Sequence, residues 1–159
     1  GPGCLMYSLV LSCELRPALR AIQHTHEFVL GTVAEALAPL VPGIRYRGTS
    51  DLALASEQKF SGNSLRCKRR CLLYHGTLLY DFRLEWIAAY LTMPPRQPDY
   101  RRGRSHAEFV ANLPASRAAI RQALLEAWKP SGQLHDWPQA ATVRLAAEKY
   151  TQAEWNLRL

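Results

Sequence analysis

The chain has 159 residues, a mass of 18.0 kDa and a formal net charge of +7. Hydrophobic residues make up 48% of it and charged residues 21%, which is typical of a globular domain and excludes a disordered, collagen-like or coiled-coil protein. No apolar run reaches the roughly 18 residues of a membrane span, and the sequence shows no secretory signal, so we expect a cytoplasmic protein with no membrane partner.

The first third of the chain predicts a strand followed by a helix. Residues 4–12 are a continuous apolar run, which favours a buried strand at this length. Pro17 is expected to open a helix, and the apolar residues between Ile22 and Leu37 recur at helical spacing, so they form one face. The proline and glycine residues from Pro39 onward end this helix.

The middle of the chain predicts strands. Residues 44–46 and 51–55 look like a strand interrupted by a turn at Gly48. Residues 59–65 and 71–82 predict two longer strands, and the basic segment 66–70 connects them. The simplest arrangement is an antiparallel hairpin with a basic tip.

The last part of the chain predicts helices. We expect them over about 84–91, 117–128 and 138–150. Residues 93–100 hold three prolines and are expected to be irregular. Ser105 and Glu108 have the spacing of a helix-capping box, and Ser116 is suited to cap the helix after it. Strands followed by helices predict an α+β fold, with a small, mainly antiparallel sheet packed by helices.

The positive charge is concentrated in the centre of the chain. Between Ala55 and Arg104, ten Lys and Arg residues stand against four Asp and Glu, whereas the rest of the chain holds ten against nine. A local cationic field of this kind attracts phosphates, carboxylates, nucleic acids or acidic proteins, and charge alone does not choose among them.

Four cysteines are present: Cys4, Cys13, Cys67 and Cys71. The spacing of Cys67 and Cys71 is unusual for a zinc pair, and the other two cysteines have no His at ligand spacing. We therefore expect reduced thiols and no cysteine metal site.

The stretch from Gly48 to Asp81 carries the residues best suited to chemistry. It places an acid (Asp51), a lysine (Lys59), a Ser61-Gly62 pair and a His75-Gly76-Thr77 turn on neighbouring predicted strands. Glycines let backbone N–H groups approach a ligand, and a lysine is a point-charge donor to phosphate or carbonyl oxygen. The pattern favours a nucleotide or acyl-phosphate pocket over a hydrolase triad, although each motif is short and an ordinary solvated face is the alternative.

Three motifs in this stretch resemble those of the superfamily of lipoate–protein ligases, biotin–protein ligases and octanoyltransferases, with the lipoate–protein ligase A branch the most similar. The motifs are Gly48-Thr49-Ser50-Asp51-Leu52, Gln58-Lys59-Phe60-Ser61-Gly62-Asn63-Ser64 and His75-Gly76-Thr77-Leu78-Leu79. The segment after them and the late Glu148-Lys149-Tyr150 with Trp155-Asn156 also resemble this family. The resemblance extends over essentially the whole chain.

The resemblance implies a two-step reaction. Lipoate or octanoate reacts with ATP and Mg²⁺ to give an acyl adenylate, and the acyl group then passes to a lysine of a carrier protein. Lys59 would be the catalytic lysine. Asp51, Ser61, Gly62, His75, Gly76 and Thr77 would bind the substrate and adenylate, and Asp51 is also the candidate metal ligand. The expected partner is a lipoyl carrier, either the glycine cleavage H protein or the lipoyl domain of a 2-oxoacid dehydrogenase.

One departure from the family concerns the start of the chain. The family's Arg- and Gly-rich element is missing, and residues 1–8 look like the segment that follows it. The resemblance therefore implies a single partial catalytic domain over 1–159, lacking its N-terminal portion, with 130–159 as a C-terminal helical extension. Either the sequence is a fragment, or a second chain supplies the missing part.

Two other functions remain open at this stage. Octanoyltransferases of the superfamily use a cysteine and no ATP, and Cys67 and Cys71 lie beside basic residues that favour thiolates. A non-catalytic subunit that binds lipoyl or adenylate groups is the other alternative.

Residues 96–104 combine basic side chains with Tyr100, but we expect a loop beside the carrier-docking face rather than a nucleic-acid site.

Overall fold

A computed structural model describes residues 1–158. Gly1–Lys129 and the residues from Pro130 onward form two compact units. The first unit contains β1 (Cys4–Ser12), η1 (Pro17–Arg20), α1 (Ile22–Leu37), β2 (Arg45–Arg47), β3 (Asp51–Ala53), β4 (Lys59–Cys67), β5 (Cys71–Leu79), α2 (Glu85–Tyr90), η2 (Asp99–Arg101), α3 (His106–Phe109) and α4 (Arg117–Trp128). The second contains α5 (Gln139–Leu145), η3 (Ala146–Tyr150) and α6 (Ala153–Asn156).

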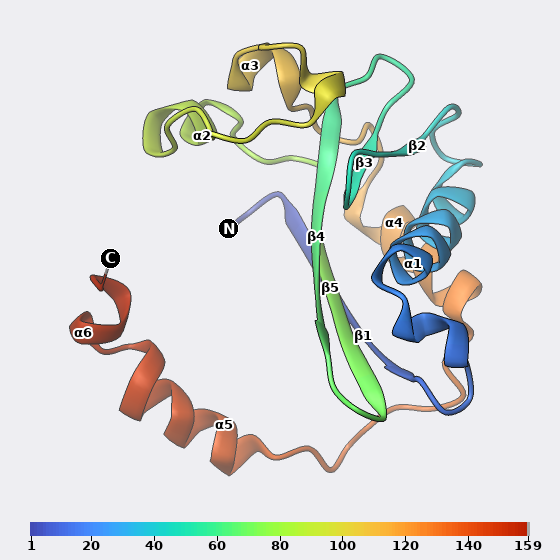
Figure 1. The fold of residues 1–159 in the computed structure, drawn as a ribbon, viewed down its shortest axis with the longest axis vertical. Helices are drawn as coiled ribbons and strands as arrows, with labels where there is room; N and C mark the ends of the chain where they lie inside the picture. Colours follow the sequence, from blue (N-terminus) through green and yellow to red (C-terminus); the bar gives the residue numbers. More distant parts are fainter. Residues whose placement is uncertain (159) are drawn as a thin grey trace. The chain divides into compact units, whose positions relative to one another are not determined.

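The five strands form one antiparallel sheet in the order β1-β5-β4-β3-β2. β4 and β5 make the predicted hairpin with the basic tip, and they run side by side along the length of the sheet (Figure 1). β1 pairs with β5 along its whole length, from Cys4 opposite Leu79 to Ser12 opposite Cys71. The α+β fold with a mainly antiparallel sheet is therefore confirmed.

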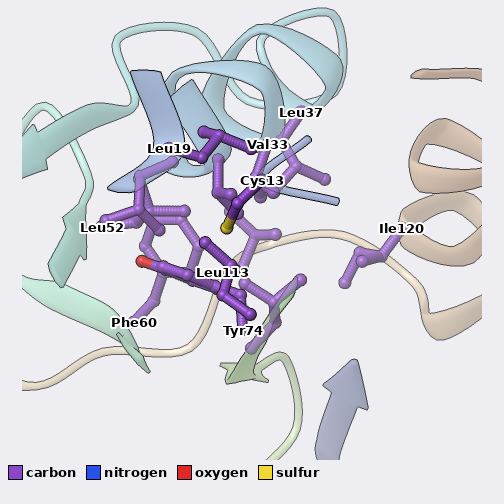
Figure 2. Close-up of a cluster of buried hydrophobic side chains, with 13 residues drawn as sticks. Cys13, Leu19, Val33, Leu37, Leu52, Phe60, Tyr74, Leu113 and Ile120 are labelled. Atoms are coloured by element: carbon purple, nitrogen blue, oxygen red, sulfur yellow. The ribbon is translucent and has the colours of Figure 1, made fainter. Parts of the chain in front are cut away.

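One face of the sheet is buried beneath helices. Successive side chains of a strand point to opposite faces, so one face of the sheet can be buried. α1 packs against β2 and β3, and α4 lies beside α1 (Figure 1). Figure 2 shows this core, in which Leu52, Phe60 and Tyr74 of the sheet lie close to Val33 and Leu37 of α1. The opposite face is open along β1, where Met6 is 71% exposed and Val10 is 74% exposed.

Several elements differ in detail from the sequence prediction. Pro17 opens a separate 3₁₀ turn, because the extended backbone of Ala21 divides that turn from α1. The extended segments on either side of Gly48 are two strands that pair antiparallel, since the chain reverses at the turn between them. The last predicted helix becomes π-helical at Ala146.

Two predicted helix starts have the expected caps. Ser105 and Glu108 form a reciprocal capping box at α3, and the Ser116 hydroxyl accepts a hydrogen bond from the Ala119 N–H at the start of α4. Within residues 1–158, none of the helices combines the length and apolar character that crossing a membrane requires.

Candidate functional site

A β-bulge lies where Lys59 enters the sheet. Leu52 pairs with Ser61 and the next residue of β3, Ala53, pairs with Lys59, so β4 has one extra residue, Phe60. A bulge of this kind changes the direction of the side chains beside it. Phe60 is fully buried in the core, while Lys59 lies over Gly62 of its own strand.

Lys59 and Asp51 form an ion pair. The Lys59 Nζ lies 2.7 Å from the Asp51 Oδ1, with side-chain exposures of 30% and 10%. Asp51 is directly opposite Gly62 in the register, and a Cβ on Gly62 would lie 3.4 Å from both Cε and Nζ of Lys59. The absence of a side chain at Gly62 thus gives Lys59 room to reach Asp51. The result is a fixed, partly exposed cation, which suits contact with an anionic or polarised oxygen.

The second oxygen of Asp51 is bound by Tyr100. The Tyr100 hydroxyl donates a hydrogen bond to the Asp51 Oδ2 over 2.8 Å. Burial, followed by the negative charge of Asp51, raises the pKa of Tyr100 well above its ordinary value of 10.0. Tyr100 is therefore a neutral donor, and both carboxylate oxygens of Asp51 have partners.

Two open pockets lie at the surface around Lys59. Lys59, Gly62 and Thr77 line both of them. One has a volume of about 410 Å³ and is also lined by Asp51, His75 and Gly76. The other has a volume of about 310 Å³ and includes Ser61. The structure therefore brings all seven sequence-predicted site residues to the walls of these two pockets.

The 310 Å³ pocket has an apolar part and a cationic part. Its apolar walls include Ile87, Leu91 and Phe109, and its polar walls include Lys59 and Arg101. A pocket with mostly apolar walls and a few placed polar groups is the usual form of a small-molecule site. This one suits a ligand that combines an apolar surface with negative charge.

Ser61 and Gly76 are linked to the site through Asn63. The Asn63 amide donates to the Ser61 hydroxyl over 3.0 Å and to the Ser50 carbonyl over 2.8 Å, and its oxygen accepts from the Tyr7 hydroxyl. Ser61 is 1% exposed. A Cβ on Gly76 would overlap the Asn63 side-chain oxygen. Asn63 thus fixes Ser50, the residue before Asp51, and Gly76 leaves space for the Asn63 side chain.

His75 and Thr77 lie on the open face of β5. His75 is exposed, opposite Ser8 of β1 and Ser64 of β4. Thr77 is half-buried and lies opposite Gly62. Neither side chain has a hydrogen-bond partner among residues 1–158, so both are available to a ligand.

None of the four cysteines lines these two pockets. All four are free thiols, and Cys67 and Cys71 flank the basic tip at the opposite end of β4 from Lys59. No group of three or more His, Cys, Asp or Glu residues able to hold a metal gathers in the described part of the chain. Asp51 is the residue that the sequence analysis named as a metal ligand, and Lys59 and Tyr100 already engage its two oxygens.

Three residues of the site were missed by the sequence analysis: Asn63, Tyr100 and Arg101. Tyr100 and Arg101 belong to the segment interpreted as a surface loop, yet Arg101 is only 4% exposed and lies 4.7 Å over the Phe109 ring. The one signal for them was an aromatic residue beside three arginines in a proline-rich segment. Asn63 lies inside the Lys59 motif, where its polar side chain on a predicted strand was the available signal.

Comparison with known proteins identifies a family through one family model and a shared fold through solved structures. Residues 1–128 match the family model of the lipoyl protein ligase A/B catalytic domain. A comparison with curated proteins gives no match. Among solved structures, a bi-partite lipoate protein ligase with its E2 lipoyl domain from Thermoplasma acidophilum is similar with a TM-score of 0.76 and 21% identity, over 99% of this chain and 66% of that one.

Two further structures have the same fold. Lipoate-protein ligase A bound with ATP has a TM-score of 0.71 and 22% identity, over 97% of this chain and 65% of that one. A biotin protein ligase from Aquifex aeolicus has a TM-score of 0.54 and 14% identity, over 92% of this chain and 55% of that one. The chain thus spans about two thirds of the length of the lipoate ligases that it matches.

Proposed function

This chain belongs to the lipoyl protein ligase A/B catalytic-domain family, and we propose that it activates lipoate or octanoate with ATP and passes the acyl group to a lysine of a carrier protein. The observation that carries the proposal is the ion pair between Lys59 and Asp51 at the junction of two open pockets. The pair supplies a fixed positive charge where an acyl carbonyl and a phosphate would meet.

In the first step, a carboxylate oxygen of the acid attacks the α-phosphorus of ATP. The bond from that phosphorus to the bridging oxygen breaks, and pyrophosphate leaves with the electron pair. Negative charge accumulates on the non-bridging oxygens, and Lys59, which lines the pocket, is proposed to stabilise it. Gly62 leaves room for the Lys59 ammonium, and Asp51 keeps it oriented.

In the second step, the neutral amine of the carrier lysine attacks the acyl carbonyl. An amide bond forms, the bond from the acyl carbon to the phosphate oxygen breaks, and AMP leaves with its electron pair. The attacking nitrogen releases one proton to solvent. The carbonyl oxygen gains negative charge during the attack, so the same lysine charge lowers the barrier. His75 and Thr77 lie on the pocket wall beside Lys59 and are proposed to line the adenylate site.

The substrates are inferred from related proteins. One similar structure is a lipoate-protein ligase A bound with ATP. Another is a putative lipoate protein ligase from T. acidophilum with bound lipoic acid, with a TM-score of 0.72 and 20% identity. The apolar and cationic walls of the 310 Å³ pocket support a ligand of this amphipathic kind.

Mg²⁺ is proposed to arrive with ATP. Magnesium is commonly held by one or two carboxylates together with substrate phosphates. Within the described residues, Asp51 stands without a second carboxylate in the pocket lining, which does not form a magnesium site on its own. The ATP phosphates would have to supply most of the ligands.

The carrier is proposed to be an acidic lipoyl protein. One similar ligase was determined with its E2 lipoyl domain, and the central part of this chain carries most of the surplus positive charge. Opposite charges speed the encounter of two proteins.

We also propose that residues 130–159 are an extension of the catalytic domain, because the family match ends at residue 128.

The direct test is lipoate- or octanoate-dependent exchange between ATP and labelled pyrophosphate. We expect acid-dependent exchange once the Arg- and Gly-rich N-terminal element is supplied. Under the same conditions we expect a loss of about 100-fold or more in Lys59→Ala, because one preorganised charge contributes about 2.7–4 kcal/mol to a transition state.

Lys68→Ala is the matched control. Lys68 is exposed at the hairpin tip, so its removal changes the net charge equally without touching the pockets. Its exchange rate should stay within twofold of the unaltered chain. Normal exchange in Lys59→Ala would disprove the role of Lys59, and exchange that does not depend on an acid would count against the reaction.

A further inference from the structure

We propose that Tyr100 is a positioning residue, which acts on the reaction by holding the Asp51 carboxylate and, through it, the Lys59 ammonium. This inference rests on the proposed function of Lys59. Its basis is the continuous chain of contacts from the Tyr100 hydroxyl to Asp51 Oδ2 at 2.8 Å, and from Asp51 Oδ1 to Lys59 Nζ at 2.7 Å.

The segment that carries Tyr100 is anchored to the rest of the unit. Arg104 donates to the Glu57 carbonyl and to the Tyr100 carbonyl, each over 2.9 Å. Arg101 donates to the Arg104 carbonyl over 2.9 Å, and both guanidinium groups lie over the Phe109 ring. Although the segment is proline-rich and mostly irregular, these contacts hold Tyr100 in place beside Asp51, the first residue of β3.

The Tyr100 ring has two close neighbours. It lies 5.1 Å from the Phe109 ring, measured between centroids. It also lies near Gly48, where a Cβ would be 3.4 Å from Tyr100 Cε1 and 3.3 Å from Pro98 Cβ. Gly48 has a φ of +56°, so the turn before Asp51 needs glycine for its backbone as well as for this close approach. These contacts aim the hydroxyl at Asp51.

The hydrogen bond from Tyr100 suits a role in orienting the Asp51 carboxylate rather than in transferring a proton. Tyr100 is separated from Lys59 by the carboxylate, and it does not line either pocket that Lys59 lines. Hydrogen bonds to a charged group are stronger than neutral ones and fix its direction. Since Asp51 has one donor on each oxygen, loss of the Tyr100 hydroxyl frees the carboxylate to rotate and Lys59 to move with it.

The first variant is Tyr100→Phe, which removes the hydroxyl and keeps the ring contacts. In acid-dependent ATP–pyrophosphate exchange we expect kcat to fall about tenfold, the effect of losing one hydrogen bond to a charged group, with the KM for ATP within about twofold. Tyr46→Phe is the matched control, because its hydroxyl donates to the Thr49 carbonyl of the same turn over 2.7 Å. It should retain the unaltered kcat.

A double-mutant cycle tests whether Tyr100 acts through Asp51. If it does, Asp51→Asn with Tyr100→Phe has the same kcat as Asp51→Asn alone, because the hydroxyl no longer holds a paired carboxylate. A further tenfold loss in the double variant would mean that Tyr100 acts independently, and it would overturn the inference.

A second readout needs no catalysis. Acetic anhydride acylates free amines, and mass spectrometry compares the modification of Lys59 with that of exposed Lys68 in the same sample. We expect Tyr100→Phe to raise the ratio of Lys59 to Lys68 modification about threefold or more, as Asp51→Asn should also do, while Tyr46→Phe leaves it unchanged.

This labelling separates the two hypotheses. If the unaltered chain had no exchange activity with the Arg- and Gly-rich N-terminal element supplied, the result would count against the proposed function. The labelling ratio would still decide the role of Tyr100. An unchanged ratio in Tyr100→Phe, with a raised ratio in Asp51→Asn, would show that Tyr100 does not hold Lys59.

Discussion

Gly76 of β5 is confined between two neighbouring strands. A Cβ added there would overlap the Asn63 side-chain oxygen and lie 2.8 Å from Tyr7 Cε1. Overpacking of this kind costs about 1–3 kcal/mol. We therefore expect Gly76→Ala to lower the free energy of unfolding by about 1–3 kcal/mol in chemical denaturation, and to disturb the Asn63 contact that fixes Ser50.

Gly31→Ala provides the control for this prediction. Gly31 lies within α1, and a Cβ there would meet no atom within 4 Å. Alanine favours a helix over glycine by about 0.5–1 kcal/mol, so this variant should be more stable. Equal stability of the Gly76→Ala variant and the unaltered chain would contradict the tight packing described around Asn63.

At this scale the sequence could predict residues that share a short motif. Asp51, Lys59 and Gly62 each belong to one, and they meet because β3 and β4 are adjacent. Tyr100 could not be found this way, because it is 49 residues from Asp51 and reaches it through an irregular segment. Motif spacing also did not distinguish two pocket residues with different surroundings. Ser61 is buried and its hydroxyl is hydrogen-bonded to Asn63, whereas Thr77 is half-buried.

His26 connects α1 to the sheet. Its Nδ1 lies 2.8 Å from the Tyr74 hydroxyl, and both residues are buried. Burial lowers the pKa of His26 below its ordinary value of 6.5. Below about pH 6.5 the unfolded chain therefore binds more protons than the folded one, so stability should fall as the pH drops through this range.

The measurement is the free energy of unfolding between pH 7.5 and 5. His26→Asn keeps a hydrogen-bonding side chain but removes the titration, so the slope below pH 6.5 should become smaller. His24→Asn should keep the slope of the unaltered chain, since His24 is exposed on the same helix. A slope that is unchanged in His26→Asn would assign the acid sensitivity to other groups.

The long elements were the easiest to predict. β1 has the predicted bounds, but the expectation of a buried strand was wrong: β1 is an edge strand of the sheet, and none of its residues is buried. The caps at Ser105 and Ser116 were predictable because they are local hydrogen bonds. The pairing of β2 with β3 was not predicted, because three-residue strands carry little periodic signal. The bulge at Phe60 was missed as well, since only the pairing with β3 reveals it.

On the scale of the whole molecule, stability and the candidate site both belong to the first unit. The buried core extends along the chain from Cys13 to Ile120, and every residue that lines a pocket with Lys59 comes before residue 111. In the second unit, α5, η3 and α6 contain no buried residue. Burial of apolar surface is the main favourable term in folding, so the second unit contributes little to it.

We therefore expect residues 1–129 alone to unfold at nearly the same temperature as the whole chain. A difference of 1 kcal/mol shifts Tm by several degrees in a domain of this size, so calorimetry should find the two midpoints within about 4 °C. A chain that ends at residue 115 is the control, because it also loses Ile120, which is fully buried against the core.

That shorter chain should unfold at a much lower temperature or fail to fold, since removing a buried aliphatic side chain typically costs about 2–5 kcal/mol. A large loss of Tm on removal of residues 130–159 would instead mean that these helices protect apolar surface of the first unit. Their exposed side chains, among them Trp137 and Val143, would then be the contacts to test next.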